Sequence, residues 1–171
     1  EETGLVVCFH VSTGRDPRAV GGYGGALINY VCHSMATTAE PLVQLISACV
    51  FERFPRLRAG TVESGIGWIP WLLETMDYAY HAHHFWIRPR TPELPSTYYR
   101  RNCFSTFQKD HEGLAHVEEL GLQGNYLWAN DYPHHEGSGP YTRETLRAVF
   151  SDVPEAEMRD VLGGNAAKLY G

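Results

Sequence analysis

An aspartate that follows a short apolar run is the first candidate for a catalytic residue. The stretch is Tyr-Leu-Trp-Ala-Asn-Asp-Tyr-Pro-His, residues 126–134, and its ionisable side chains are Asp131 and His134. A continuous apolar run is typical of a buried parallel strand, which delivers the residue at its end to the edge of an α/β sheet. An aspartate close before a proline can equally serve as a turn or helix cap, so this alternative stays open.

His10 ends a second apolar run, Leu-Val-Val-Cys-Phe-His, residues 5–10. Imidazole and carboxylate groups are the usual ligands of a borderline divalent ion such as zinc, and a catalytic site leaves one position open for water. His10 and Asp131 are therefore a candidate pair of metal ligands. The residue types do not show that the two side chains meet, and a structural histidine is the alternative.

The rest of the chain supplies the elements that must position these residues. Apolar runs predict strands over residues 5–10 and 127–131, and strand-like segments predict two more over 57–63 and 103–107. Helical periodicity, capping residues and prolines predict helices over residues 26–35, 40–53, 65–80, 112–120, 142–150, 154–164 and 166–170. Strands that alternate with helices predict an α/β fold with a parallel sheet. The loops after the strands, at 11–25 and 134–140, are where such folds keep their sites.

Composition limits the class of protein. The chain has 171 residues, 43% of them hydrophobic, and a net charge of −6, which indicates one folded domain and argues against nucleic-acid binding. It contains no apolar run of membrane-spanning length and no signal-peptide pattern. Cys8, Cys49 and Cys103 lie in apolar runs, so we expect buried free thiols and a cytoplasmic location. The chain starts without methionine directly before a strand, which suggests the middle of a fold.

Several motifs in this order resemble one family. They are Val-Cys-Phe-His at 7–10, Phe-Pro-Arg-Leu at 54–57, Glu-Ser-Gly-Ile-Gly-Trp-Ile-Pro at 63–70, Trp-Ala-Asn-Asp-Tyr-Pro-His at 128–134 and Val-Leu-Gly-Gly-Asn-Ala-Ala-Lys-Leu-Tyr at 161–170. The chain is similar to the carboxyl-terminal half of the amidohydrolase-related family, which includes the aminocarboxymuconate-semialdehyde decarboxylase group. The resemblance implies a metal-dependent (β/α)8 TIM barrel. Residues 1–171 would supply about strands five to eight and the carboxyl-terminal helices of one barrel domain, without its amino-terminal strands.

The resemblance also implies roles for individual residues. His10 matches the metal-binding histidine of the fifth strand, and Asp131 matches the aspartate of the eighth strand that binds the metal or its water. One divalent ion is implied, with zinc first and manganese as the alternative. It would lower the pKa of a bound water, and Asp131 would take the proton. His134, beside the motif aspartate, would bind substrate or hold its loop.

Two departures from the family pattern matter. The family's first strand carries a His-x-His pair or an acidic variant of it, and no residue before His10 supplies this. Many decarboxylase members end the sixth strand in a histidine, and this chain has Glu63 there. Glu63 would be a replacement acid/base, a partner that orients a ligand, or a structural residue. The departure favours a hydrolase that acts on a small organic substrate through a metal-activated water.

Three functions therefore compete on sequence grounds. Hydrolysis stands first, non-oxidative decarboxylation of an unsaturated or aromatic acid second, and a non-catalytic or truncated barrel fragment third. Half a barrel leaves two unpaired strand edges, so we expect a homo-oligomer or association with the missing amino-terminal half. His81, His83 and His84 resemble a metal-binding tract by composition, although a surface or oligomer contact explains them equally well.

Overall fold

The computed structural model describes residues 2–12 and 18–171 and contains one parallel sheet. Its strands are β1 (Val7–His10), β2 (Ala59–Val62), β3 (Cys103–Phe107) and β4 (Tyr126–Trp128), side by side in that order. All neighbouring strands are parallel, with His10 opposite Val62 and Phe107 opposite Trp128. The predicted α/β class with a parallel sheet is confirmed.

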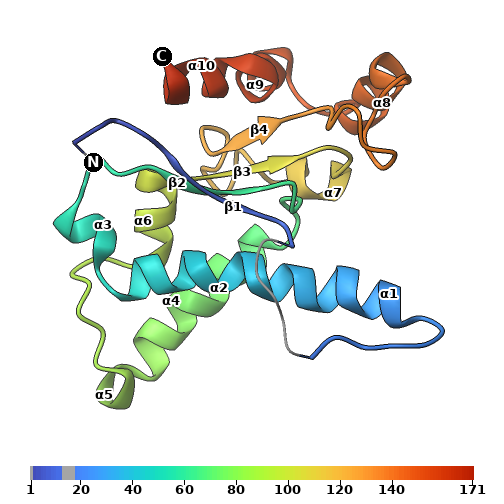
Figure 1. Ribbon diagram of the computed structural model, residues 1–171. Coiled ribbons are helices and arrows are strands. Elements are labelled where there is room, and N and C mark those ends of the chain that lie inside the picture. The colour runs from blue at the N-terminus through green and yellow to red at the C-terminus, as the bar shows by residue number, and fades with distance from the viewer. Residues whose placement is uncertain (1, 13–17) are drawn as a thin grey trace.

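Helices connect and surround the strands. Figure 1 shows α2 and α4 next to one another on one side of the sheet, and α9 and α10 beyond β4. No helix of the described ranges is long and apolar enough to cross a membrane. The helices are α1 (Gly25–Ile28), the π-helical η1 (Asn29–His33), α2 (Ser34–Ser47), α3 (Val50–Arg53), α4 (Ile69–Ala82), α5 (His84–Ile87), α6 (Pro95–Asn102), α7 (His111–Leu114), α8 (Thr142–Val149), α9 (Glu155–Arg159), the π-helical η2 (Asp160–Gly164) and α10 (Asn165–Tyr170).

The helices differ from the prediction in several places: α5 and α6 were not predicted, and α4 begins at Ile69 instead of residue 65. The helices expected over 26–35 and 40–53 are joined, because a continuous helical segment runs over residues 25–47. A break separates this segment from α3, and Cys49 there has a left-handed backbone with φ 58°. Residues 36–39, where a gap between the two helices was expected, are helical. The Thr37 and Thr38 hydroxyls donate to the Ser34 carbonyl, so these threonines bond within the helix and do not end it. The helix expected over 112–120 is α-helical only in α7, and turns follow it.

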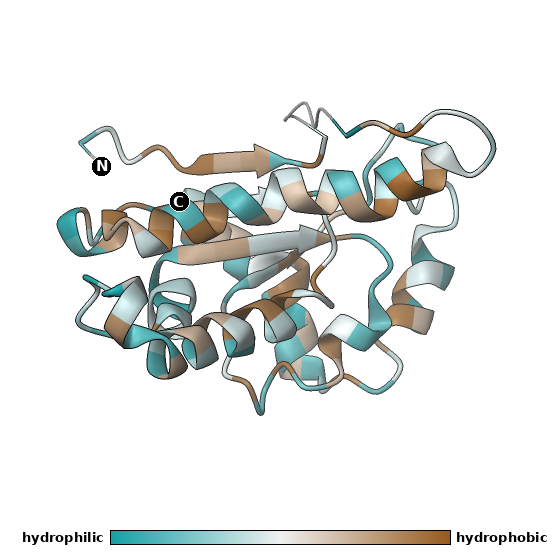
Figure 2. Cartoon of the chain, turned by 90° about the horizontal axis from the view of Figure 1, so that it is seen from below, coloured by the Kyte–Doolittle hydropathy of each residue, from teal (hydrophilic) through white to brown (hydrophobic). Residues whose placement is uncertain are grey.

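β1 is more exposed than a buried strand should be. Leu5 is 74% exposed and Val7 39%, and Cys8 is also exposed, so the prediction of a buried strand with a buried thiol was wrong here. Among the described residues β1 pairs with β2 alone, which leaves its other edge open. Figure 2 shows β1 as a separate border of the sheet, with hydrophobic residues along it.

The hydrophobic core lies between the sheet and the helices. Leu42 and Ile46 of α2, Phe51 of α3 and Tyr99 of α6 are at most 1% exposed and belong to one cluster. Three hydroxyl groups inside this layer are paired with one another. The Ser105 hydroxyl of β3 lies 2.8 Å from the Thr61 hydroxyl and 2.9 Å from the Tyr99 hydroxyl.

Three buried asparagines fasten the amino-terminal ends of the strands. The Asn102 side-chain amide donates to the carbonyls of Pro55 and Leu57, just before β2. Asn125 donates to the carbonyls of Tyr99, Arg100 and Cys103, and Asn165 to those of Gln123 and Tyr126. Each side-chain amide thus provides hydrogen bonds to backbone carbonyls that the neighbouring strands do not bond.

Candidate metal centre

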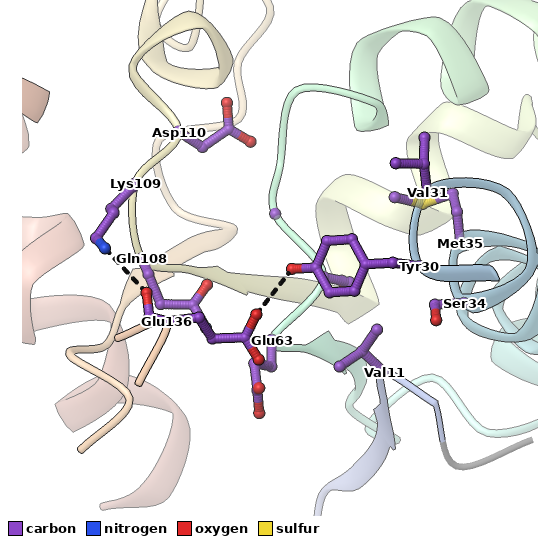
Figure 3. A pocket seen from close by; sticks show the side chains of 12 residues that line it. Val11, Tyr30, Val31, Ser34, Met35, Glu63, Gln108, Lys109, Asp110 and Glu136 are labelled. Atoms are coloured by element: carbon purple, nitrogen blue, oxygen red, sulfur yellow. Dashed lines mark hydrogen bonds between the residues drawn. The ribbon is translucent and has the colours of Figure 1, made fainter. Parts of the chain in front are cut away.

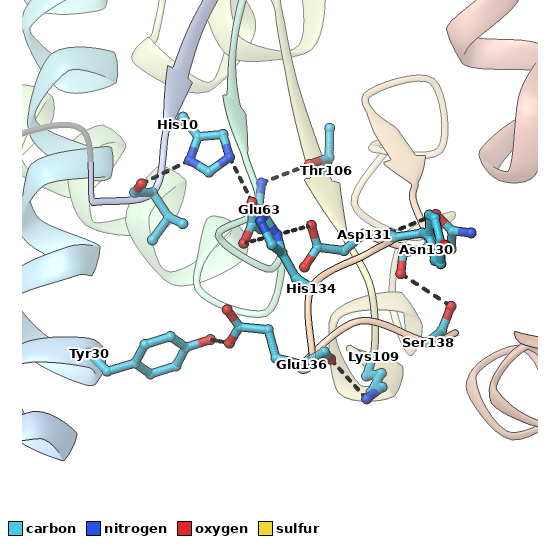
Figure 4. A network of polar contacts seen from close by, with 12 residues as sticks. His10, Tyr30, Glu63, Thr106, Lys109, Asn130, Asp131, His134, Glu136 and Ser138 are labelled. Carbon is cyan, nitrogen blue, oxygen red and sulfur yellow. Dashed lines mark hydrogen bonds and ion pairs between the residues drawn. The ribbon is translucent and has the colours of Figure 1, made fainter. Parts of the chain in front are cut away.

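The carboxyl-terminal ends of the strands gather the ionisable residues that the sequence singled out. His10 is the last residue of β1, and Glu63 directly follows β2. β4 ends at Trp128, so the expectation that Asp131 would close this strand was wrong, and Asp131 lies in the following loop. That loop nevertheless turns back over the sheet, and His10, Glu63, Asp131 and His134 converge (Figure 4).

Short polar contacts join these four side chains. His10 Nε2 lies 2.6 Å from Glu63 Oε2, and His134 Nδ1 lies 2.9 Å from Asp131 Oδ1 and 3.8 Å from Glu63 Oε1. Glu63, Asp131 and His134 each offer one ligand atom, and these atoms all lie within 4.8 Å of one another. The structure therefore brings together every residue that the sequence proposed for the site. Their roles as ligands or catalysts stay predictions.

The two carboxylates are poorly solvated. The side chains of Glu63 and Asp131 are 12% and 11% exposed. Asp131 Oδ2 is buried and has no hydrogen-bond partner among the described residues. Burying a carboxylate oxygen without a partner is costly, and a divalent cation would offset that cost. The unpartnered oxygen and the oxygen and nitrogen donors around it fit a divalent metal ion.

The ring of His10 is oriented by a hydrogen bond from its Nδ1 nitrogen. Its Nδ1 lies 2.9 Å from the Val11 carbonyl oxygen, which can only accept a hydrogen bond, so we infer that Nδ1 carries the proton. Metal-binding histidines commonly donate their second ring N–H to a carbonyl in this way. Nε2 then faces Glu63, on the side where the carboxylates gather.

Glu63 and Asp131 both have left-handed backbones, with φ 61° and 57°. Left-handed backbone costs a residue other than glycine about 1–2 kcal/mol, and such residues concentrate at functional sites. Contacts from neighbouring elements hold both residues in place. The Glu63 amide donates to Thr106 Oγ1 at 2.9 Å, and the His134 amide donates to the Asp131 carbonyl at 2.9 Å.

Asp110 is a residue that the sequence analysis missed. Its Oδ2 accepts from the amides of Ile66 and Gly67 at 2.6 and 2.7 Å, and its Oδ1 accepts from the Gly113 amide at 3.0 Å. One carboxylate thus caps α7 and clamps the loop that leads from Glu63 to α4. The sequence Asp-His-Glu-Gly carried an available signal, since aspartate is a preferred residue at a helix N-cap.

A cavity of about 380 Å³ opens beside Glu63. Tyr30, Val31 and Met35 form one wall, and Gln108 and Lys109 stand across from them (Figure 3). A mostly apolar pocket with a few polar groups is the usual form of a small-molecule site. The cavity next to the candidate metal centre is therefore a candidate small-molecule site.

Tyr30 closes one side of this cavity. Its hydroxyl donates to Glu136 Oε2 at 3.2 Å, and the Lys109 ammonium donates to the Glu136 carbonyl at 2.9 Å. Burial and the neighbouring Glu136 carboxylate raise the pKa of the Tyr30 phenol. Tyr30 thus stays neutral at physiological pH and can act there as a hydrogen-bond donor.

His81, His83 and His84 lie at the end of α4 and the start of α5, away from the strand ends. His84 Nδ1 contacts the His81 carbonyl, and the His83 ring packs against Trp86. Within residues 2–12 and 18–171, the group with metal-binding geometry is Glu63, Asp131 and His134, and the histidine tract is not part of it.

The titration of His134 should report on Asp131. The hydrogen bond to Asp131, and then its negative charge, raise the pKa of His134. The interaction favours the cationic ring, so its stabilising effect is present at low pH and is lost as the pH rises through the raised pKa. By NMR titration of chelator-treated protein, we expect Asp131→Asn to lower the pKa of His134. The exposed Asp152→Asn serves as control, and an equal shift in both variants would contradict the assignment.

Fold and site together define a class of protein. Parallel strands that carry metal-binding residue types at their carboxyl ends are typical of (β/α)8 barrel enzymes. The family model described as "Amidohydrolase" matches residues 1–171, and the chain belongs to this family. No curated protein matches the sequence.

Solved structures confirm the barrel architecture. 5-Carboxyvanillate decarboxylase from Sphingomonas paucimobilis is 27% identical with a TM-score of 0.77, and the match covers 99% of this chain and 50% of that one. An amidohydrolase from Mycobacterium avium subsp. paratuberculosis is 22% identical with a TM-score of 0.75, over 99% and 43%. 2,6-Dihydroxybenzoate decarboxylase from Rhizobium is 19% identical with a TM-score of 0.69, over 95% and 50%. The chain spans about half the length of these proteins and forms part of a (β/α)8 barrel.

Proposed function

We propose that the chain is the carboxyl-terminal part of a metal-dependent decarboxylase that removes carbon dioxide from a small aromatic acid. The observation that carries the proposal is the 27% identity to 5-carboxyvanillate decarboxylase over 99% of the chain. The alternative from the sequence thus moves ahead of hydrolysis. The cavity beside Glu63 supports it, because its apolar wall suits an aromatic ring.

We propose His10 and Asp131 as metal ligands, with Glu63 beside them. The solved structures of 5-carboxyvanillate decarboxylase from Novosphingobium aromaticivorans and of a dihydroxybenzoic acid decarboxylase from Polaromonas hold manganese. Manganese therefore replaces zinc as our first expectation, and zinc stays the alternative. When bound, the ion supplies positive charge that orients a substrate carboxylate or hydroxyl group.

The residues of the chain have defined tasks in this proposal. Val31 and Met35 hold the ring of the substrate, and the Tyr30 ring closes the cavity beside it, with its hydroxyl donated to Glu136. When the bond to the carboxylate breaks, carbon dioxide leaves and the electron pair stays on the ring carbon. That carbon takes a proton, which we propose passes from the cationic His134 ring to hydrogen-bonded Asp131 and from Asp131 to the carbon.

Hydrolysis remains a second candidate because of Glu63. A second carboxylate stands where, by the family resemblance, many decarboxylases carry histidine. It lies within 4.8 Å of the ligand atoms of Asp131 and His134. Glu63 or Asp131 would then take the proton of an attacking water. The third candidate, a non-catalytic fragment, predicts that no metal binds.

The open edge of β1 indicates where further strands of a barrel would pair. The chain covers about half of its structural relatives, and the open edge of β1 exposes Leu5 and Val7. We propose that this edge is covered by the amino-terminal strands of the complete barrel. A homo-oligomer stays a separate proposal.

The deciding experiment compares two reactions on the complete protein. Metal content is measured first, and the protein is then assayed with manganese, with zinc and with a chelator. We expect carbon dioxide release from hydroxylated benzoic acids with manganese and none with the chelator. Release of acid from lactones or esters without carbon dioxide would favour hydrolysis instead. Absence of any stoichiometric divalent ion would sink both enzymatic proposals.

A further inference from the structure

A second cleft lies on the helical side of the molecule, away from the strand ends. It has a volume of about 370 Å³ and is bounded by α2, α4 and the segment that joins α5 to α6. Figure 1 shows this segment passing from α5 to α6 beside the end of α2. The cleft shares no lining residue with the cavity beside Glu63, and its apolar lining consists of Val43, Ile46, Met76, Ala79, Pro89 and Pro95.

Two arginines line the same cleft. Arg88 and Arg90 are both exposed, and neither side chain forms a hydrogen bond, ion pair or ring contact within the described ranges. The nearby carboxylates are already engaged, since Glu93 pairs with Arg101 at 3.5 Å and Asp77 accepts from the Ser96 amide at 2.9 Å. Two uncompensated positive charges thus stand on a chain whose net charge is −6.

The backbone that carries these arginines is anchored on both sides. The Arg88 amide donates to the His84 carbonyl at 2.9 Å and closes α5. The Tyr80 hydroxyl of α4 donates to the Thr91 carbonyl at 2.9 Å, and Thr91 is only 6% exposed. Pro89, between the two arginines, further restricts the chain. The arginines therefore extend from a backbone whose position is set before any ligand arrives.

We infer that this cleft binds a small amphipathic carboxylate, such as an aromatic or medium-chain acid. The apolar body would lie against Val43, Ile46 and Met76, and the carboxylate would meet Arg88 and Arg90. Guanidinium groups suit this anion because they offer paired donors in carboxylate geometry. Clefts of about this size bury small organic ligands. The inference does not rest on the proposed function.

The test uses 2-naphthoate and its neutral isostere 2-naphthamide as probes in isothermal titration calorimetry of the complete protein. In the Arg88→Gln/Arg90→Gln double variant, we expect about tenfold weaker binding of the naphthoate and unchanged binding of the amide. Ala79→Leu, which fills the cleft, should weaken both probes. The control is Arg143→Gln/Arg147→Gln on α8, which keeps the same net charge as the test variant.

A chelator separates the cleft from the metal centre. Binding in the cleft should persist at the same affinity when the metal is removed. Loss of binding on chelation would overturn the inference, as would equal affinity in the wild type and the Arg88→Gln/Arg90→Gln variant. Equal weakening by the α8 control would show general charge attraction and would also overturn it.

Discussion

Replacing Asp131 by asparagine should abolish metal binding and lower activity by roughly 10²–10⁴-fold, while the protein stays folded. The amide keeps the shape of the side chain but loses the charge that would meet a cation at the buried Oδ2 position. The fold should survive because asparagine tolerates the left-handed backbone that residue 131 adopts, with φ 57°. Metal stoichiometry, turnover and the thermal unfolding midpoint are measured on the same preparation.

The matched control for this variant is Asp152→Asn. Asp152 is 83% exposed and faces His111 on the surface, far along the chain from the motif. It should bind metal and turn over substrate like the wild type. If Asp131→Asn still binds one equivalent of metal with wild-type affinity, Asp131 is not a ligand, and the assignment of the centre is wrong.

Replacing Asp110 by alanine should lower the free energy of unfolding by about 2–4 kcal/mol, because three backbone amides lose their acceptor. The loop between Glu63 and α4 would also lose its attachment to the residues after β3. Metal affinity and activity should therefore fall together with stability. Urea unfolding followed by circular dichroism gives the free energy, and calorimetry gives the metal affinity.

Two further variants show which contact matters. Glu112→Ala removes a carboxylate that is 94% exposed two residues away, and should change the free energy of unfolding by less than about 0.5 kcal/mol. Asp110→Asn retains one carbonyl acceptor and should fall between alanine and the wild type. A stability loss in Asp110→Ala no larger than in Glu112→Ala would rule out the clamp.

Much of the fold could be predicted because buried parallel strands have a simple signature. The short segments that became β2 and β3 mix apolar and small hydroxyl residues, and both strands are mostly buried as expected. The exposure of β1 could not be read from its residues, because burial depends on which strand lies beyond it. The join of two predicted helices was missed because threonines that bond within the helix look like a loop in the sequence.

The candidate site was predictable in part for a similar reason. His10 and Glu63 stand at strand ends, and parallel strands bring such ends to one edge. The left-handed backbone of Glu63 has no marker at that position, where glycine would be the usual signal. The contacts of Asp110 with Ile66 and of Tyr30 with Glu136 join segments that are distant in sequence, and no local pattern encodes such contacts.

The side-chain amides of Asn102, Asn125 and Asn165 have a consequence for how this protein can diversify. They secure the chain at the amino-terminal ends of the strands, whereas the cavity and the carboxylates occupy the opposite ends. The asparagine contacts and the candidate site thus lie at opposite ends of the strands. Mutations that reshape the wall around Tyr30 and Met35 should leave this fastening intact. Substitutions in the cavity wall can then change substrate preference with little loss of folding stability, which favours the evolution of new specificities on this fold.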